Sequence, residues 1–274
     1  MGSPLKVLLP TNFSVQASYA QILLEKLAQH IPIECHLAHV LPFPETVSIL
    51  PDGNILTCGE IDLGFIALQR DLALEKLKSI KGEFAGHHIL VGSFVDAIES
   101  YAHRQQFDLI VMGTKGTDGW VEKLAGSKAQ HVVRQSSTPV LSLMCDRSDW
   151  QPNEVLLVHQ FDKEEIELPH AALEILKAFG SEVHLLEFVK EEHPENQRKI
   201  YTAMDLFAGK LGLSNIKKHV LVEKDVEQGV YHFDQMKSVD LLLIGTHAKG
   251  GIFHQSATEK LVNHMYKPIL TFHI

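Results

Sequence analysis

The feature that most constrains the fold of this chain is an internal duplication of short apolar segments. Three segments of the first half match three of the second: VLLPTN at 7–12 with VLLVHQ at 155–160, FDLIVMG at 107–113 with VDLLLIG at 239–245, and TPVL at 138–141 with KPIL at 267–270. The separation between matching positions falls from 148 residues (Asn12 to Gln160) to 132 (Gly113 to Gly245) and 129 (Pro139 to Pro268). The first copy therefore carries 16 extra residues before Gly113 and 3 after it.

Within the first copy, apolar runs typical of buried strands alternate with segments whose apolar residues recur at helical spacing. We expect strands at 6–10, 33–41, 88–91, 109–112 and 139–144, and helices at 17–27, 61–80, 94–106 and 127–135, with Ser14 capping the first helix. This alternation predicts a parallel sheet with helices on both faces and right-handed crossovers. A polar segment at 145–153 is expected to link two domains, at 1–146 and 153–274.

Most of the extra length in the first copy falls in LPFPETVSILPDGNILTCGE, residues 41–60. Pro51-Asp-Gly-Asn54 separates two short apolar runs, which indicates a β-hairpin. An irregular surface loop explains the segment equally well, because an isolated two-stranded hairpin is marginally stable unless it packs on something. The sequence leaves both alternatives open.

The candidate site lies in LIVMGTKGTDGWVEKLAGS, residues 109–127, where a strand leads into a glycine-rich turn and then a helix. The glycines and the following serine form the pattern Gly-x2-Gly-x9-Gly-Ser, from Gly113 and Gly116 to Gly126 and Ser127. Glycines let backbone N–H groups approach an anion, and a helix start offers unpaired N–H groups and the positive end of a dipole. The pattern matches neither a Walker A loop nor a dinucleotide-binding Gly-x-Gly-x2-Gly motif.

This stretch closely resembles the nucleotide-binding signature of the ATP-binding branch of the universal stress protein family, and the whole chain resembles the family's tandem form. The resemblance implies an α/β fold of two tandem doubly wound five-stranded parallel-sheet domains, Rossmann-like, that pair through their last strands as an intramolecular pseudo-dimer. It also implies a stress-response regulatory protein that holds ATP, or else ADP or AMP, in its first half. A further homodimer is left open.

By the same resemblance, the triphosphate is expected at Gly113, Gly116, Gly126 and Ser127, with the Lys128 N–H adjacent. The nucleoside end is expected at Pro10, Thr11, Asn12, Val40 and Met112. Asn12 departs from the aspartate usual in the ATP-binding branch and brings no negative charge, which leaves recognition of the base or ribose and of Mg²⁺ open.

The second copy departs much further from the glycine pattern. Ala248 stands in place of the second glycine, Gln255-Ser256 in place of Gly-Ser, and six residues instead of nine separate them. Cβ atoms at these positions would crowd a phosphate, so we expect the second site to be degenerate and to keep only a structural role.

Composition excludes several other classes of protein. With 45% hydrophobic and 22% charged residues the 274-residue chain is typical of a globular protein. A net charge of −9 argues against a nucleic-acid partner, and no apolar run is long enough to span a membrane. Three cysteines without Cys-x2-Cys spacing suggest reduced thiols, so we expect a cytoplasmic protein.

Two negative expectations complete the interpretation. The 17 histidines are scattered without a recognised metal-binding spacing, and we assign no metal site. Nothing beside the glycine turn marks a general base or a nucleophile, so we assign no catalytic residue, although a very slow ATPase remains an alternative. A second alternative is a nucleotide-free scaffold of the same fold, which the Asn12 departure and the degenerate second site would fit.

Overall fold

The computed structural model describes residues 3–44, 46–50, 52–57, 62–114, 128–161, 167–246, 261 and 265–274, with only the backbone for residues 128–130 and 134. The first half comprises β1 (Leu5–Pro10), α1 (Val15–Ala28), β2 (Ile33–Leu41), β3 (Val47–Ile49), β4 (Ile55–Thr57), α2 (Leu63–Ser79), β5 (Gly86–Val91), α3 (Phe94–Arg104), β6 (Leu109–Gly113), α4 (Lys128–Gln135) and β7 (Val140–Leu143). The second half comprises β8 (Glu154–Val158), α5 (His170–Phe179), β9 (Glu182–Val189), α6 (Pro194–Leu211), β10 (Ile216–Val222), α7 (Val226–Lys237), β11 (Leu241–Thr246) and β12 (Ile269–His273).

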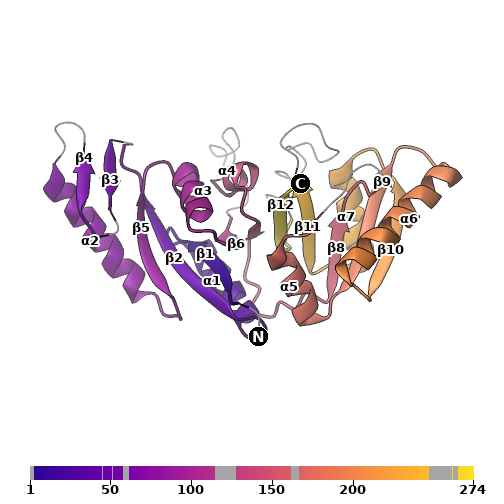
Figure 1. The fold of residues 1–274 in the computed structure, drawn as a ribbon, viewed down its shortest axis with the longest axis horizontal. Helices are drawn as coiled ribbons and strands as arrows, with labels where there is room; N and C mark the ends of the chain where they lie inside the picture. The colour runs from indigo at the N-terminus through magenta and orange to yellow at the C-terminus, as the bar shows by residue number, and fades with distance from the viewer. Residues whose placement is uncertain are drawn as a thin grey trace.

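All strands except the hairpin belong to one ten-stranded sheet that runs across the molecule in the order β10-β9-β8-β11-β12-β7-β6-β1-β2-β5 (Figure 1). Each half has its first strand in the middle, its second and third main strands on one side, and its last two on the other. The pairings within each half are parallel, and the two halves meet where β7 pairs antiparallel with β12. The predicted fold class, including the internal pairing through the last strands, is confirmed.

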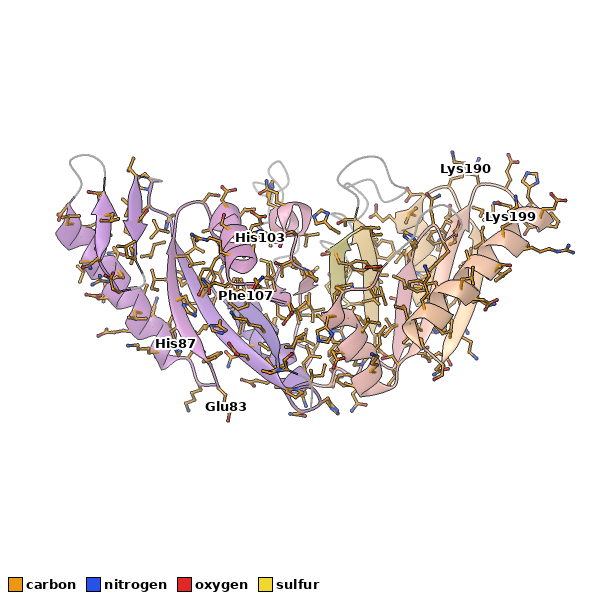
Figure 2. All side chains as sticks on the ribbon, in the orientation of Figure 1. Glu83, His87, His103, Phe107, Lys190 and Lys199 are labelled. Atoms are coloured by element: carbon orange, nitrogen blue, oxygen red, sulfur yellow. The ribbon has the colours of Figure 1, made fainter. Side chains whose placement is uncertain are left out.

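Helices cover both faces of the sheet, and its central strands are therefore buried on both sides. Buried side chains of α1, α2, α5 and α6 belong to one hydrophobic cluster, and those of α3, α4 and α7 belong to the other. Both clusters include residues of both halves, so the core continues through the junction (Figure 2). Among the described residues, no helix combines the length and hydropathy needed to cross a bilayer.

The segment between β7 and β8, which the sequence predicts to be a linker, is anchored at Trp150. The Trp150 side chain is 5% exposed, its Nε1 donates to the Asp240 carbonyl at 2.8 Å, and its ring lies 5.9 Å from that of Phe179. The ring of His30, from the first half, lies 4.4 Å from the same Phe179 ring and is tilted by 44° to it. The connection is therefore packed on the second half, at a phenylalanine that also contacts the first half.

Of the two alternatives for residues 41–60, the structure contains the hairpin, since β3 and β4 pair antiparallel. It lies in the long connection from β2 to α2, residues 42–62, whereas residues 190–193 alone connect β9 to α6 in the second half. The hairpin packs against α2 and β5 at the outer end of the first half (Figure 1). This contact supplies the support that an isolated hairpin lacks.

Candidate functional site at the switch point of the first half

The candidate site lies where the direction of the sheet order reverses. After β1 the chain builds outward through β2 and β5, and then returns to place β6 on the other side of β1. In such sheets ligands bind beyond the carboxyl ends of the strands at this switch point. Parallel pairing of Val7 with Leu109 and of Leu8 with Ile110 brings the ends of β1 and β6 together.

Three of the residues predicted to bind the nucleoside share one face of the sheet. Leu8, Ala38 and Ile110 belong to the cluster covered by α3 and α4. Because side chains alternate along a strand, Pro10, Val40 and Met112, each two residues further along, face the same side. Pro10 and Met112 are buried and Val40 is partly buried. The structure thus brings these three residues to one edge.

A network of hydrogen bonds fixes the loop that follows β1. The Phe13 N–H donates to Thr11 Oγ1 at 3.0 Å, and the Ser14 N–H donates to Asn12 Oδ1 at 3.2 Å. Ser14 Oγ accepts from the Ala17 N–H at 3.3 Å, which confirms the predicted N-cap of α1. The Asn12 oxygen is therefore engaged by the backbone, and the side chain itself is exposed.

His39 is a neighbour of this loop that sequence reasoning missed. Its Nδ1 lies 2.7 Å from the Thr11 carbonyl oxygen, and because a carbonyl only accepts, Nδ1 carries the proton. The His39 ring packs 4.6 Å from that of Phe13, whose φ of 62° is unusual for a residue other than glycine. The parallel register of β1 and β2 places His39 beside Thr11, and local sequence carries no signal of this pairing.

Gly113, at the end of β6, has a packing role that the glycine pattern does not reveal. A Cβ built on Gly113 would lie 2.0 Å from the Gln16 carbonyl oxygen, in the first turn of α1. Gly113 therefore lets the start of α1 lie against the end of β6. Gly116, Gly126 and Ser127 lie outside the described residues, and α4 begins at Lys128.

Thr114 is a second residue that sequence reasoning missed. Its N–H donates to the Leu143 carbonyl at 2.8 Å, so the ladder between β6 and β7 continues past Gly113 and alternation puts Thr114 on the face of Met112. The side chain is 2% exposed, and its hydroxyl has no hydrogen-bond partner among the described residues. A buried hydroxyl without a partner is costly, so Thr114 is a polar group at this strand end whose hydrogen bonding the described residues do not satisfy.

The equivalent position in the second half is satisfied. Thr246 Oγ1 donates to the Phe272 carbonyl at 3.2 Å. A Cβ at the neighbouring Gly245 would lie 2.0 Å from Cδ1 of Ile274, so an isoleucine side chain packs on this strand end. The two halves thus have the same topology and different polar groups at their switch points.

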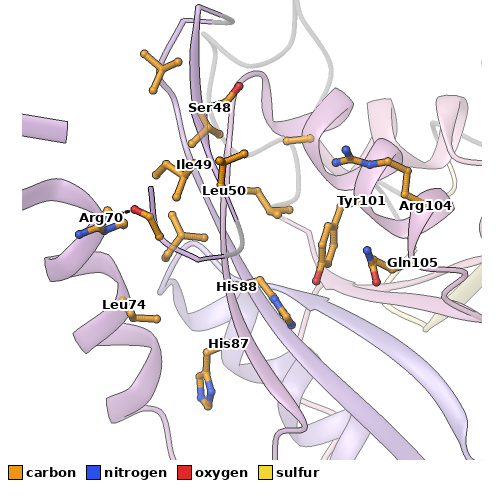
Figure 3. A pocket seen from close by; sticks show the side chains of 16 residues that line it. Ser48, Ile49, Leu50, Arg70, Leu74, His87, His88, Tyr101, Arg104 and Gln105 are labelled. Atoms are coloured by element: carbon orange, nitrogen blue, oxygen red, sulfur yellow. Dashed lines mark hydrogen bonds between the residues drawn. The ribbon is translucent and has the colours of Figure 1, made fainter. Parts of the chain in front are cut away.

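A cavity of about 720 Å³ lies away from the switch point, between the β3–β4 hairpin, α2, β5 and α3 (Figure 3). Several of its polar groups already bond to the protein: Arg70 to the Gly53 carbonyl, His88 to His36, and Arg104 to the Ser100 carbonyl. Burial lowers the pKa of His88 to about 4, with smaller contributions from the charges of His36 and His87. We therefore place the candidate site at the strand ends.

Known proteins resemble this chain in two ways: one relative matches about half of it in sequence, and solved structures match nearly all of it in fold. A universal stress protein of Methanocaldococcus jannaschii is 27% identical over 139 residues, which cover 50% of this chain and 79% of that protein. Among solved structures, a universal stress protein from Archaeoglobus fulgidus aligns over 98% of this chain and 96% of its own, with a TM-score of 0.68 and 15% identity.

Two further structures align over nearly the whole chain. One is a putative universal stress protein of Pseudomonas aeruginosa, with a TM-score of 0.60, 16% identity, and coverage of 99% of this chain and 94% of that one. The other is the cytoplasmic domain of a prokaryotic cation chloride cotransporter, with a TM-score of 0.53, 10% identity, and coverage of 98% and 95%. At these identities the likeness concerns the fold alone. The model of the universal stress protein family matches residues 5–143, and the chain therefore belongs to that family.

Proposed function

We propose that the protein binds an adenine nucleotide, ATP in the first instance, at the switch point of its first half and acts as a regulatory protein of the stress response. The observation that carries this proposal is the Thr114 hydroxyl, which is buried and has no partner among the described residues. Its counterpart Thr246 bonds to the Phe272 carbonyl in the half whose glycine pattern is lost. A ligand with acceptor atoms at the first strand end would satisfy the unpartnered group.

The surroundings of Thr114 also favour a ligand with an apolar part and an anionic part. Pro10, Val40 and Met112 provide an apolar wall on the same face of the sheet. Helix α4 connects the parallel strands β6 and β7 and packs on that face through Val132 and Val133, so it starts at the edge where β6 ends. Its first N–H groups and the Gly126-Ser127 pair before it suit a phosphate.

The proposal is tested by titrating ATP into the protein in a calorimeter, once with Mg²⁺ and once with EDTA. We expect wild-type binding in the micromolar to low-millimolar range. Gly126→Asp should weaken it by more than about tenfold, because a carboxylate and a Cβ would meet the phosphates. Gln255→Asp is the matched control in the second half and should leave ATP affinity unchanged.

Absence of binding up to low-millimolar ATP would overturn the proposal in favour of a nucleotide-free scaffold, as would equal affinities of wild type and Gly126→Asp. Thermal denaturation gives an independent reading, since a ligand at about 100 times its dissociation constant stabilises by about 2.7 kcal/mol. Measurement of ADP release in the same samples distinguishes a regulatory nucleotide site from a slow ATPase.

A further inference from the structure

An arrangement of glutamate and paired histidines recurs in both halves, away from the nucleotide site. In the first half, His36 Nε2 lies 2.8 Å from Glu34 Oε1, and its Nδ1 lies 3.0 Å from Nε2 of His88 on β5. In the second half, His184 Nε2 lies 2.6 Å from Glu154 Oε2, and its Nδ1 lies 2.9 Å from Nε2 of His219 on β10. Both imidazole pairs lie on the two outermost strands of their half.

One position in this arrangement differs between the halves. Lys6 pairs with Glu34 across β1 and β2, whereas Glu154 pairs with Glu182 across β8 and β9. Lys6 carries an ammonium group that donates to the Gln105 carbonyl at 2.8 Å, and Glu154 supplies a second carboxylate instead. The duplication has therefore placed a cation in one half and an additional anion in the other.

We propose that Glu154, Glu182 and His184 form a binding site for a divalent transition-metal ion such as Zn²⁺. One ligand atom from each of these residues lies within 4.8 Å of the other two. His184 Nε2 is 2.6 Å from Glu154 Oε2 and 3.7 Å from Glu182 Oε1. Bonds of about 2.0–2.2 Å to a central ion need separations of roughly 3.0–3.6 Å, which modest carboxylate movements would supply.

The ligand set and its exposure favour this class of ion. One imidazole with two carboxylates suits Zn²⁺ or Co²⁺, whereas Ca²⁺ needs six to eight oxygen ligands. The side chains of Glu154 and Glu182 are 40% and 27% exposed, so an ion can enter from solvent and water can complete its coordination. Lys217 Nζ, 3.8 Å from Glu182 Oε2, belongs to an exposed side chain that can leave the carboxylate.

Contacts with Phe233 and His219 fix the position of the His184 ring. It is 1% exposed and packs edge-on against Phe233, with ring centroids 5.5 Å apart and an interplanar angle of 69°. When Nε2 binds an ion, the His184 proton resides on Nδ1 and donates to Nε2 of His219, which then carries its own proton on Nδ1. Such an outer hydrogen bond orients most metal-binding histidines.

These ligands come from two strands, which explains why a search for local spacings misses them. Glu182 and His184 are separated by one residue on β9, and Glu154 lies opposite Glu182 on β8. The site involves no residue of the proposed nucleotide site.

The test is a calorimetric titration of Zn²⁺ into chelator-stripped, full-length protein. Wild type should bind one ion whose affinity falls by more than about tenfold in Glu154→Lys, the variant that copies the first half. The reciprocal variant Lys6→Glu should gain a second site, because Glu34, His36 and His88 are already in place. Nitrogen NMR of wild type should show His184 changing from the Nε2-protonated to the Nδ1-protonated tautomer on addition of Zn²⁺.

Adventitious zinc on other histidines or cysteines would survive Glu154→Lys unchanged, and that result would overturn the proposal. Unaltered stoichiometry in Lys6→Glu, or an unchanged His184 tautomer, would also contradict it. Circular dichroism melting checks that each variant folds. If Glu154→Lys does not fold, the near-isosteric Glu154→Gln and Glu182→Gln provide the same comparison.

Discussion

The two switch points of this molecule share one topology and differ in what surrounds their strand ends. In the first half, His39 donates to the Thr11 carbonyl and Phe13 is only partly buried. In the second half, Glu187 stands in place of His39, and its Oε2 accepts from the Phe161 N–H at 2.8 Å. A glutamate has replaced an imidazole beside the loop where the family's ligands are expected.

Side chains also pack against the described strand ends of the second switch point. Phe161 is 7% exposed and packs edge-on against Phe207 with ring centroids 5.4 Å apart. Ile274 lies against Gly245 on the neighbouring strand. The buried carboxyl of Glu187 would further disfavour a phosphate. These contacts agree with the expectation that the second half keeps a structural role.

The comparison also separates two reasons for a glycine. Gly113 and Gly245 are present in both halves, and in both a Cβ would meet other atoms at 2.0 Å. The later glycines of the motif are replaced in the second half by Ala248 and Gln255. Packing thus explains the glycine kept in both copies, and a ligand role stays a prediction for the glycines that differ between copies.

The largest expected change in the free energy of unfolding concerns the glycine at each strand end. Gly113→Ala should destabilise the protein by about 2–4 kcal/mol, because the new Cβ meets the backbone oxygen of Gln16. Gly245→Ala meets Cδ1 and Cγ1 of the partly exposed Ile274 side chain, which can rotate away more easily than a backbone oxygen can move, and should cost about 1 kcal/mol. Urea unfolding followed by circular dichroism measures both. Equal losses would show that the two strand ends are packed alike.

A smaller difference is expected at the threonines that follow these glycines. Thr246→Val removes the hydrogen bond to the Phe272 carbonyl and should cost about 1 kcal/mol. Without nucleotide, Thr114→Val should be neutral or stabilising, because the hydroxyl it removes has no partner among the described residues. Urea unfolding measures the loss of stability in each of these two variants. A comparable loss in Thr114→Val would contradict the idea that its hydroxyl is reserved for a ligand.

The smallest effect concerns the imidazole pair of the first half and its dependence on pH. Burial lowers the pKa of His88 to about 4 from an ordinary value of 6.5. The unfolded chain therefore binds a proton at higher pH than the folded one, so stability falls as pH drops from 6.5 through 4. His88 is partly exposed to solvent, which weakens the effect of its pKa shift on stability. We therefore expect a loss of stability on the order of 1 kcal/mol.

His88→Gln should reduce this acid-induced loss, because the amide keeps a polar group at the position and does not titrate. Stabilities of wild type and variant are compared at pH 7 and pH 4, and the difference between the two losses isolates His88. A variant that loses as much stability as wild type over this interval would show that other groups cause the acid sensitivity.

The sequence by itself determined the order of strands and helices, the duplication and the N-cap at Ser14, because these depend on periodicity and on residues close in the chain. It left the hairpin and an irregular loop as equal alternatives for residues 41–60, and only the packing of β3 and β4 in the folded chain decided for the hairpin. It also predicted that Pro10 and Met112 each end a strand of a parallel sheet, and the structure shows that these two strands are neighbours. The ligand roles of Gly116, Gly126 and Ser127 stay predictions, because these residues lie outside the described part of the chain.

Only the tertiary structure decided what each polar group bonds to. The contacts of His39 with Thr11, of Gly113 with Gln16, and of His184 with Glu154 join residues that are distant in sequence. Sheet register and helix packing create these contacts, and no local pattern encodes them. Thr114 and Thr246 occupy matching Gly-Thr positions in the sequence, yet only the folded chain shows that the Thr246 hydroxyl is satisfied and that the Thr114 hydroxyl has no partner among the described residues.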